Sequence, residues 1–185
     1  MPTNGSKIME LNLVKNHIRN RPYMGGIIRD ADRVKESEEI FTPTLIVQES
    51  LDLLELECPN CFKDPEKTFL DNCCGDGQFL GEILIRKMEN GIDFRTALLS
   101  IYGVDIMLDN VERCRKHLLC GREEFRYIVD KNIVCNDALD YHYKFDDTTS
   151  TSHIEAMNLP VPNKIKTPKK KIEIKEVENN FGSLF

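Results

Sequence analysis

The sequence contains no apolar run approaching the roughly 20 residues of a membrane-spanning helix, so we expect no membrane partner. Its first seven residues are polar and lack the apolar stretch of a secretory signal. Its seven cysteines are an odd number, and their spacing shows no disulfide framework. Reduced thiols in a cytoplasmic protein are therefore the expected state.

An excess of positive charge is also missing, since the formal net charge of the chain is −6. Residues 151–185 hold six lysines and four acidic side chains, so the rest of the chain is more acidic than the whole. This balance argues against a large phosphate-binding surface, although a local basic patch can coexist with it. We therefore do not expect the main part of the chain to hold DNA unaided.

The length and composition fit one globular domain, with 185 residues of which 41% are apolar and 30% charged. The sequence pattern predicts an N-terminal helical segment, a main α/β domain, and a polar linker with a tail, at residues 1–40, 41–146 and 147–185. In the first part, Leu11, Val14 and Ile18 share one helical face, and Gly25-Gly26 is a break. Three prolines exclude long helices from the tail.

The main domain alternates short apolar strands with amphipathic helices. Strands are predicted at residues 68–71, 100–105 and 132–136. A first helix is predicted after Thr42 as N-cap and Pro43 as first helical residue. A second follows the first strand and ends at Asn90-Gly91, and a third is capped by Asp109 or Asn110 and ends near Gly121. This order predicts a doubly wound parallel α/β unit.

Residues suited to ligand binding follow each predicted strand. Asp71 to Gly77 follow the first strand, Asp105 the second and Asp137 the third. Ligands of such sheets bind outside the carboxyl ends of the strands. Gly75 and Gly77 allow the backbone to approach a ligand closely. Asp105 can accept hydrogen bonds from ribose hydroxyls and Asp137 from an adenine amino group, which predicts a nucleoside-containing ligand.

The glycines leave two alternatives open. Gly75 and Gly77 could begin the fingerprint of an NAD site, but that fingerprint wants a small residue where Leu80 stands. It also wants an acidic residue about 20 positions further on, whereas Asp105 lies 28 residues after Gly77. The second alternative is a purely structural glycine turn in a fold without a ligand.

Four segments, in the right order, resemble the motifs of DNA adenine-N6 methyltransferases. Asp71-Asn72-Cys73-Cys74-Gly75-Asp76-Gly77-Gln78-Phe79-Leu80 is similar to their Asp-Pro-Ala-Cys-Gly-Ser-Gly-x-Phe-Leu motif. Phe41-Thr42-Pro43 resembles the Phe-Thr-Pro element of the type I modification-subunit branch. Gly103-Val104-Asp105-Ile106 and Asn136-Asp137-Ala138-Leu139 resemble the second and third motifs. Together they cover about 100 residues, roughly half of the chain.

The resemblance implies a Rossmann-like S-adenosylmethionine-dependent methyltransferase fold, abbreviated after its first three strands. It implies S-adenosylmethionine as cofactor, with Thr42 and Cys73 at the methionine end, Asp105 at the ribose, and Asp137 with Ala138 at the adenine. The full set of cofactor-binding residues that it implies is Thr42, Pro43, Asp71, Cys73, Gly75, Gly77, Phe79, Asp105, Ile106, Asp137 and Ala138.

The departures from this family concern catalysis. Asn72 replaces a proline, and the catalytic Asn/Asp-Pro-Pro-Tyr/Phe motif, whose ring stacks on a flipped adenine, is absent. The nearest string, Asn179-Asn180-Phe181-Gly182, has no proline, so the catalytic residues stay unknown, and no target-recognition domain fits in the remaining residues. We expect a restriction-modification protein that reaches DNA weakly or through a partner subunit. The alternative is a non-catalytic protein that sequesters the cofactor or docks onto a modification complex.

Two smaller patterns carry further expectations. Cys58-Pro59-Asn60-Cys61 is half of a zinc-knuckle spacing that Cys73-Cys74 could complete, but those cysteines belong to the cofactor turn, and we expect no metal. Tyr141-His142-Tyr143 could stack bases, although aromatic residues after a strand usually pack.

The tail alternates Ile172 and Ile174 with Glu173 and Lys175, the pattern of an edge strand. We predict that the two isoleucines pack on the sheet beside Phe69 and Leu70. Without such cover, the first predicted strand would expose unpaired backbone groups at an edge of the sheet.

Overall fold

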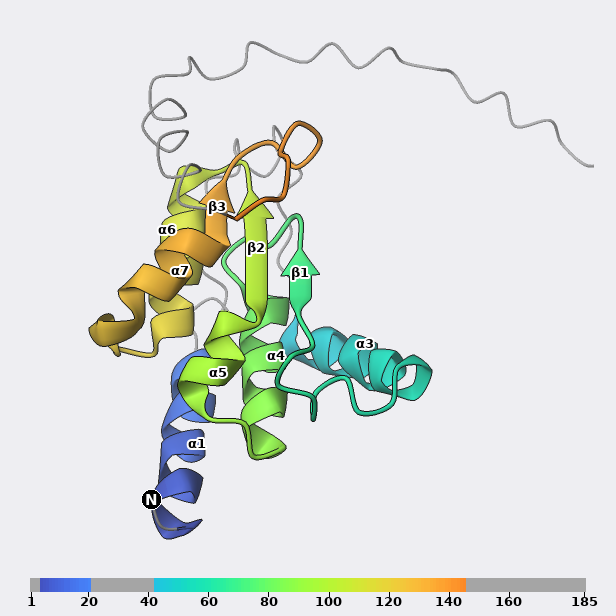
Figure 1. The fold of residues 1–185 in the computed structure, drawn as a ribbon, viewed down its shortest axis with the longest axis vertical. Helices are drawn as coiled ribbons and strands as arrows, with labels where there is room; N and C mark the ends of the chain where they lie inside the picture. The colour runs from blue at the N-terminus through green and yellow to red at the C-terminus, as the bar shows by residue number, and fades with distance from the viewer. Residues whose placement is uncertain (1–3, 21–41, 146–185) are drawn as a thin grey trace, which may run out of the picture.

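The computed structural model describes residues 4–20 and 42–145 (Figure 1). Within them, no helix is long and apolar enough to cross a membrane. The break at Gly25-Gly26, the Phe41 position, the edge strand at Ile172 and Ile174, and the string 179–182 lie outside the described residues.

The described chain is a mixed α/β fold around a small parallel sheet. The strands are β1 (Phe69–Asp71), β2 (Ile101–Asp105) and β3 (Ile133–Cys135), in the order β1-β2-β3. All three predicted strands are therefore confirmed, each within a residue of its expected bounds. The helices are α1 (Asn4–Arg19), α3 (Thr44–Glu57), α4 (Gln78–Glu89), α5 (Phe94–Leu99), α6 (Leu108–Leu119), the 3-10 turn η2 (Glu123–Phe125) and α7 (Arg126–Asn132).

The two faces of the sheet are covered differently. Side chains of Ile101 and Ile133 belong to the main core with the helices. Val104 and Val134, which are in register, belong to a separate cluster with Tyr141, Tyr143 and Phe145. One face of β2 and β3 therefore packs on helices, and the other lies under the segment that follows β3. The expectation that Tyr141 and Tyr143 pack is confirmed.

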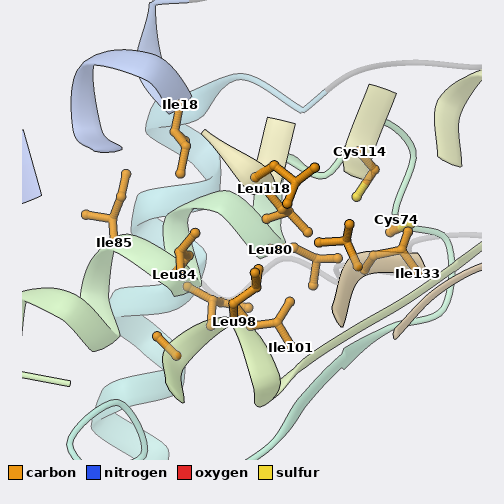
Figure 2. Packing of buried hydrophobic residues seen from close by; sticks show 14 of the residues in the cluster. Ile18, Cys74, Leu80, Leu84, Ile85, Leu98, Ile101, Cys114, Leu118 and Ile133 are labelled. Atoms are coloured by element: carbon orange, nitrogen blue, oxygen red, sulfur yellow. The ribbon is translucent and has the colours of Figure 1, made fainter. Parts of the chain in front are cut away.

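The main core joins α4 and α6 to the sheet. Figure 2 shows Leu80 of α4 between Leu118 and Ile101, with Ile18 reaching the same cluster from α1. Val14 and Ile18 are almost fully buried and Leu11 is partly buried, which confirms the predicted apolar face of the first helix.

A buried carboxylate connects three helices. Glu82 of α4 is 1% exposed and accepts two hydrogen bonds from Arg19, at 2.9 and 2.8 Å. Gln48 of α3 donates to the same carboxylate at 3.2 Å. Because Gln48 is one turn into α3 and Glu82 one turn into α4, the starts of these helices lie close together.

Lys87, fully buried in α4, attaches the chain before β1 to that helix. Its ammonium group donates to the carbonyl oxygens of Lys67 and Asp64 at 2.6 and 3.3 Å, and to Ser100 Oγ at 2.6 Å. Burial lowers the pKa of Lys87 below its ordinary value. Three hydrogen-bond acceptors therefore offset the cost of burying this ammonium group.

Two predicted helix starts were wrong. Pro43 is the N-cap of α3, because its backbone is extended and its carbonyl accepts the first helical bond from Val47 N at 3.1 Å; Thr42 lies outside the helix. Helix α6 begins at Leu108 after Met107, so Asp109 and Asn110 lie in its first turn.

The predicted helix ends are confirmed. Asn90 caps α4 and is followed by Gly91 at φ 88°. Helix α6 ends at Leu119, just before Gly121.

Candidate functional site

The loop after β1 lies against the end of β2. Gly75, at φ 52°, donates its N–H to Asp105 Oδ2 at 2.9 Å. The N–H of Cys74 donates to the carbonyl oxygen of Val104 at 2.9 Å. A positive φ is accessible to glycine without strain, which explains why this residue stands where the loop turns toward the carboxylate.

Asp105 is the central residue of this arrangement. Its Oδ1 accepts hydrogen bonds from the N–H of Met107 at 2.8 Å and from Asn110 Nδ2 at 3.4 Å. With the Gly75 bond, three of the roughly four acceptor positions of a carboxylate are used. The half-buried carboxylate can therefore accept one ligand hydroxyl as it stands, and a second by replacing Asn110, its most distant donor.

Three strand-end carboxylates affect the exposed thiol of Cys73. Burial raises the pKa of Cys73, and the negative charges of Asp71, Asp105 and Asp137 each raise it further. The parallel register of β1, β2 and β3 brings their carboxyl ends, and with them these carboxylates, to one edge of the sheet. The predicted convergence of the three strand ends is thus present in the structure.

Asp71 is affected by the same crowding. Burial raises the pKa of Asp71, as does the charge of Asp105, while the N–H of Cys73 opposes them by donating to Asp71 Oδ1 at 3.1 Å. Two neighbouring carboxylates therefore make this end of the sheet strongly negative.

The turn after β3 is held by a hydrogen bond to β2 and by hydrogen bonds of its own side chains. Asn136 N donates to the carbonyl oxygen of Asp105 at 3.0 Å, which attaches the turn to the end of β2. Asp137 Oδ1 accepts from Leu139 N at 2.8 Å, and the hydroxyl of Tyr143 donates to the carbonyl oxygen of Ala138 at 2.7 Å. The turn that carries Asp137 and Ala138 is thus attached to the end of β2.

Gly77 and Phe79 have roles inside the protein. Gly77 precedes α4 at φ 87°, and a Cβ placed there would lie 2.6 Å from Cys114 Sγ of α6. Phe79 packs, partly buried, against the main core. Helix packing explains the glycine at position 77, so the structural alternative applies to this residue, and a ligand contact there stays a prediction.

The remaining predicted residues lie around this centre. Ile106 follows Asp105 and is 56% exposed. Thr42 is half-buried and Pro43 exposed, before the start of α3. The Gln48–Glu82 contact places that start beside the start of α4, but no described hydrogen bond joins Thr42 or Pro43 to the strand-end residues.

Asn110 is a site residue that the sequence interpretation missed. It was expected to cap α6, whereas the structure buries it in the first turn with its side chain directed to Asp105. Its position five residues after an acidic strand end was the available signal.

In the described ranges 4–20 and 42–145, no group of three or more His, Cys, Asp or Glu side chains is placed to hold a metal ion. Cys61 lies beside Cys58, because its N–H donates to the carbonyl oxygen of Cys58 at 3.1 Å. Burial raises the pKa of Cys61, and the nearby Cys58 raises it further. Cys74 is instead a neighbour of Cys114, because their hydrogen bond is the main cause that raises the pKa of Cys74 well above its ordinary value. The two cysteine pairs therefore have separate surroundings.

Comparison with known proteins gives one curated relative. The chain is 29% identical over 117 residues to the Type II methyltransferase M.VspI of Vibrio sp. (strain 343), covering 63% of this chain and 24% of that protein. The chain thus spans about a quarter of the length of the relative. No family model and no solved structure matches the chain. The similarity supports a methyltransferase relationship.

Proposed function

We propose that this chain is the S-adenosylmethionine-binding part of a DNA adenine-N6 methyltransferase, with a Rossmann-like methyltransferase fold abbreviated after three strands. The observation that carries the proposal is the position of Asp71, Asp105 and Asp137 at the carboxyl ends of three adjacent parallel strands. The similarity to a Type II methyltransferase supports the same reaction class.

The charge of the site favours this cofactor over a dinucleotide. S-adenosylmethionine carries positive charge on its sulfonium and its ammonium group, whereas NAD carries a negative diphosphate. Carboxylates at the loop and at the two following strand ends attract the former and repel the latter. When bound, S-adenosylmethionine supplies an electrophilic methyl group.

Each strand end would hold one part of this cofactor. Asp71 and Cys73 would lie at its methionine end, where the loop turns at Gly75. Asp105 would accept a hydrogen bond from a ribose hydroxyl through its remaining acceptor position. Asp137 and Ala138 would meet the adenine, with Asp137 as acceptor for the amino group. Thr42, Pro43 and Ile106 would complete the outer wall.

Methyl transfer would require a second polypeptide. The reason is that the sequence has no Asn/Asp-Pro-Pro-Tyr/Phe motif. The negative net charge favours DNA contact that is weak or made through another chain. We therefore propose a partner subunit that supplies the catalytic residues and the DNA contacts. The same missing motif is compatible with a second function, a non-catalytic protein that sequesters the cofactor.

The test begins with calorimetric titration of S-adenosylmethionine into the full chain, with NAD as the comparison ligand. We expect binding of the first and none of the second. Asp105→Asn should weaken binding, and Asp109→Asn, a matched loss of one nearby carboxylate, should not. Absence of binding by the parent chain would overturn the proposal.

A second step separates the two functions. The chain is incubated with unmethylated DNA and S-adenosylmethionine labelled in its methyl group, alone and with cell extract from which the chain has been removed. Label in N6-methyladenine only after the extract is added would support a completing partner. Binding without transfer in either case would favour sequestration, and transfer by the chain alone would refute the need for a partner.

A further inference from the structure

One part of the sheet surface has no cover in the described residues. On the face away from the main helices, Val104 and Val134 are buried beneath Tyr141, with Tyr143 and Phe145 packed around them. Leu70 of β1 lies on the same face, because it is in register with Tyr102, two residues before Val104 on β2. Its side chain is nevertheless 51% exposed. A strand of a parallel sheet normally buries both faces, so this strand is incompletely covered.

The backbone of β1 has an open side at the same position. Phe69 N donates to the carbonyl oxygen of Ser100 at 2.9 Å, on the side that faces β2. Alternate residues of a parallel strand bond to opposite neighbours, so the N–H and C=O of Leu70 point away from β2. In the described chain, β1 pairs with β2 alone. Leu70 thus offers an apolar side chain and an unpaired peptide group together.

We propose that residues 172–175 of this chain, Ile172-Glu173-Ile174-Lys175, pair with the open edge of β1 and cover Leu70. The chain leaves the described part at Phe145, whose ring lies 4.8 Å from the ring of Tyr102, the register partner of Leu70. The remaining chain therefore starts beside the surface that it would cover. The intervening residues 146–171 can span far more than the roughly 4.8 Å between neighbouring strands.

The pattern of this segment fits the position. Alternation places Ile172 and Ile174 on one face, where they can cover Leu70, and Glu173 and Lys175 on the opposite face. Charged side chains on an edge strand also disfavour the addition of further strands.

Charge also favours this occupant over a second copy of the chain. The tail from residue 151 carries six lysines against four acidic residues, and the remainder of the chain is acidic. Attraction between tail and body favours docking within one molecule, whereas two bodies meeting edge to edge would repel each other.

The inference is independent of cofactor binding, and amide hydrogen exchange of the full chain, followed by NMR, tests it. We expect the Leu70 amide of the parent to exchange at least tenfold more slowly than in the full-length double variant Ile172→Asp/Ile174→Asp. The matched control is Glu173→Gln/Lys175→Gln, which changes only the alternate residues of the segment and should keep the protection. The Phe69 amide, bonded to β2, should stay equally protected in all three proteins and shows that each is folded.

Three results would overturn the proposal. Fast exchange of the Leu70 amide in the parent would show that no segment of the chain pairs with this edge, which would then be open to another protein. Equal protection in the parent and the aspartate variant would show that another segment covers it. Protection that grows with protein concentration would assign the edge to a second copy.

Discussion

Removing the carboxylate of Asp105 should affect both the fold and the proposed cofactor site. In Asp105→Ala, the N–H groups of Gly75 and Met107 lose acceptors at 2.9 and 2.8 Å. A hydrogen bond to a charged group is worth about 1.5–3 kcal/mol. Because this carboxylate is half-buried, water can replace part of each bond, and we expect a combined loss of about 2–3 kcal/mol in the free energy of unfolding. Asp105→Asn retains one acceptor oxygen and should lose about half as much.

The two variants should also differ in affinity for S-adenosylmethionine. Loss of a charge-assisted bond to a ribose hydroxyl should weaken binding roughly tenfold to a hundredfold in Asp105→Asn. Asp105→Ala should bind still more weakly, because the loop at Gly75 loses one of its two hydrogen bonds to β2. Urea unfolding measures the loss in the free energy of unfolding, and calorimetric titration measures the loss in affinity.

The control is Asp109→Asn, which removes a partly exposed carboxylate from the first turn of α6. Asp109 pairs with Arg113 at 3.6 Å, and an exposed pair of this kind contributes about 0.3–0.5 kcal/mol. If Asp105→Asn binds S-adenosylmethionine as tightly as the parent, the ribose assignment is wrong. If Asp105→Ala is as stable as the parent, the bonds from the N–H groups of Gly75 and Met107 to this carboxylate do not stabilise the fold.

Three further changes have defined outcomes. Gly77→Ala should destabilise the fold by about 1–3 kcal/mol through overpacking against Cys114 and a strained positive φ, and adding Cys114→Ala should recover part of that loss in urea unfolding. Burial holds the pKa of Lys87 below 10.5, so the unfolded chain binds more protons there and parental stability should rise as pH approaches 10.5; Lys87→Met should lack this rise. The folded-state pKa of Asp71 lies above 3.8, so parental stability should fall as pH rises from 3.8 through that pKa, and Asp71→Asn should remove the fall in unfolding curves measured across this range.

The sequence predicted the elements whose signals are local. Apolar runs located the three strands, and Asn90-Gly91 located the end of α4. The short helices α5 and α7 were missed, since six and seven residues give little periodicity. Asp93, whose side chain accepts from Thr96 N, was an available start signal for α5.

The predicted start of α6 was wrong because a side chain before the helix accepts the hydrogen bonds there. Asp109 and Asn110 both suit an N-cap, but the carboxylate of Asp105 accepts the N–H of Met107 and the amide of Asn110. Asn110, which was expected to cap the helix, instead donates its side-chain amide to Asp105. A pattern of residue types cannot show which of two acceptors within five positions takes a given donor.

For the candidate site, the sequence could predict which residues lie at the same edge of the sheet, but not which side chains pack around them. Parallel strands bring their carboxyl ends to one edge, which is enough to group Asp71, Asp105 and Asp137. The contact of Gly77 with Cys114 joins residues that only the packing of α4 on α6 brings together. The sequence therefore suggested a ligand role for a glycine whose side-chain space is taken by another helix.

The grouping of carboxylates itself argues for a function beyond folding. The charges of Asp71, Asp105 and Asp137 reach a single thiol, and Asp105 raises the pKa of Asp71 where a neutral neighbour would not. Asp105 has a structural role through its three donors, but no described backbone bond requires Asp71 to lie beside it with a carboxylate rather than an amide. Repulsion of this kind opposes folding and is relieved when a cation lies between the charges. Groups with perturbed pKa values cluster at functional sites, and the negative charge of this edge is compatible with the cationic cofactor that we propose.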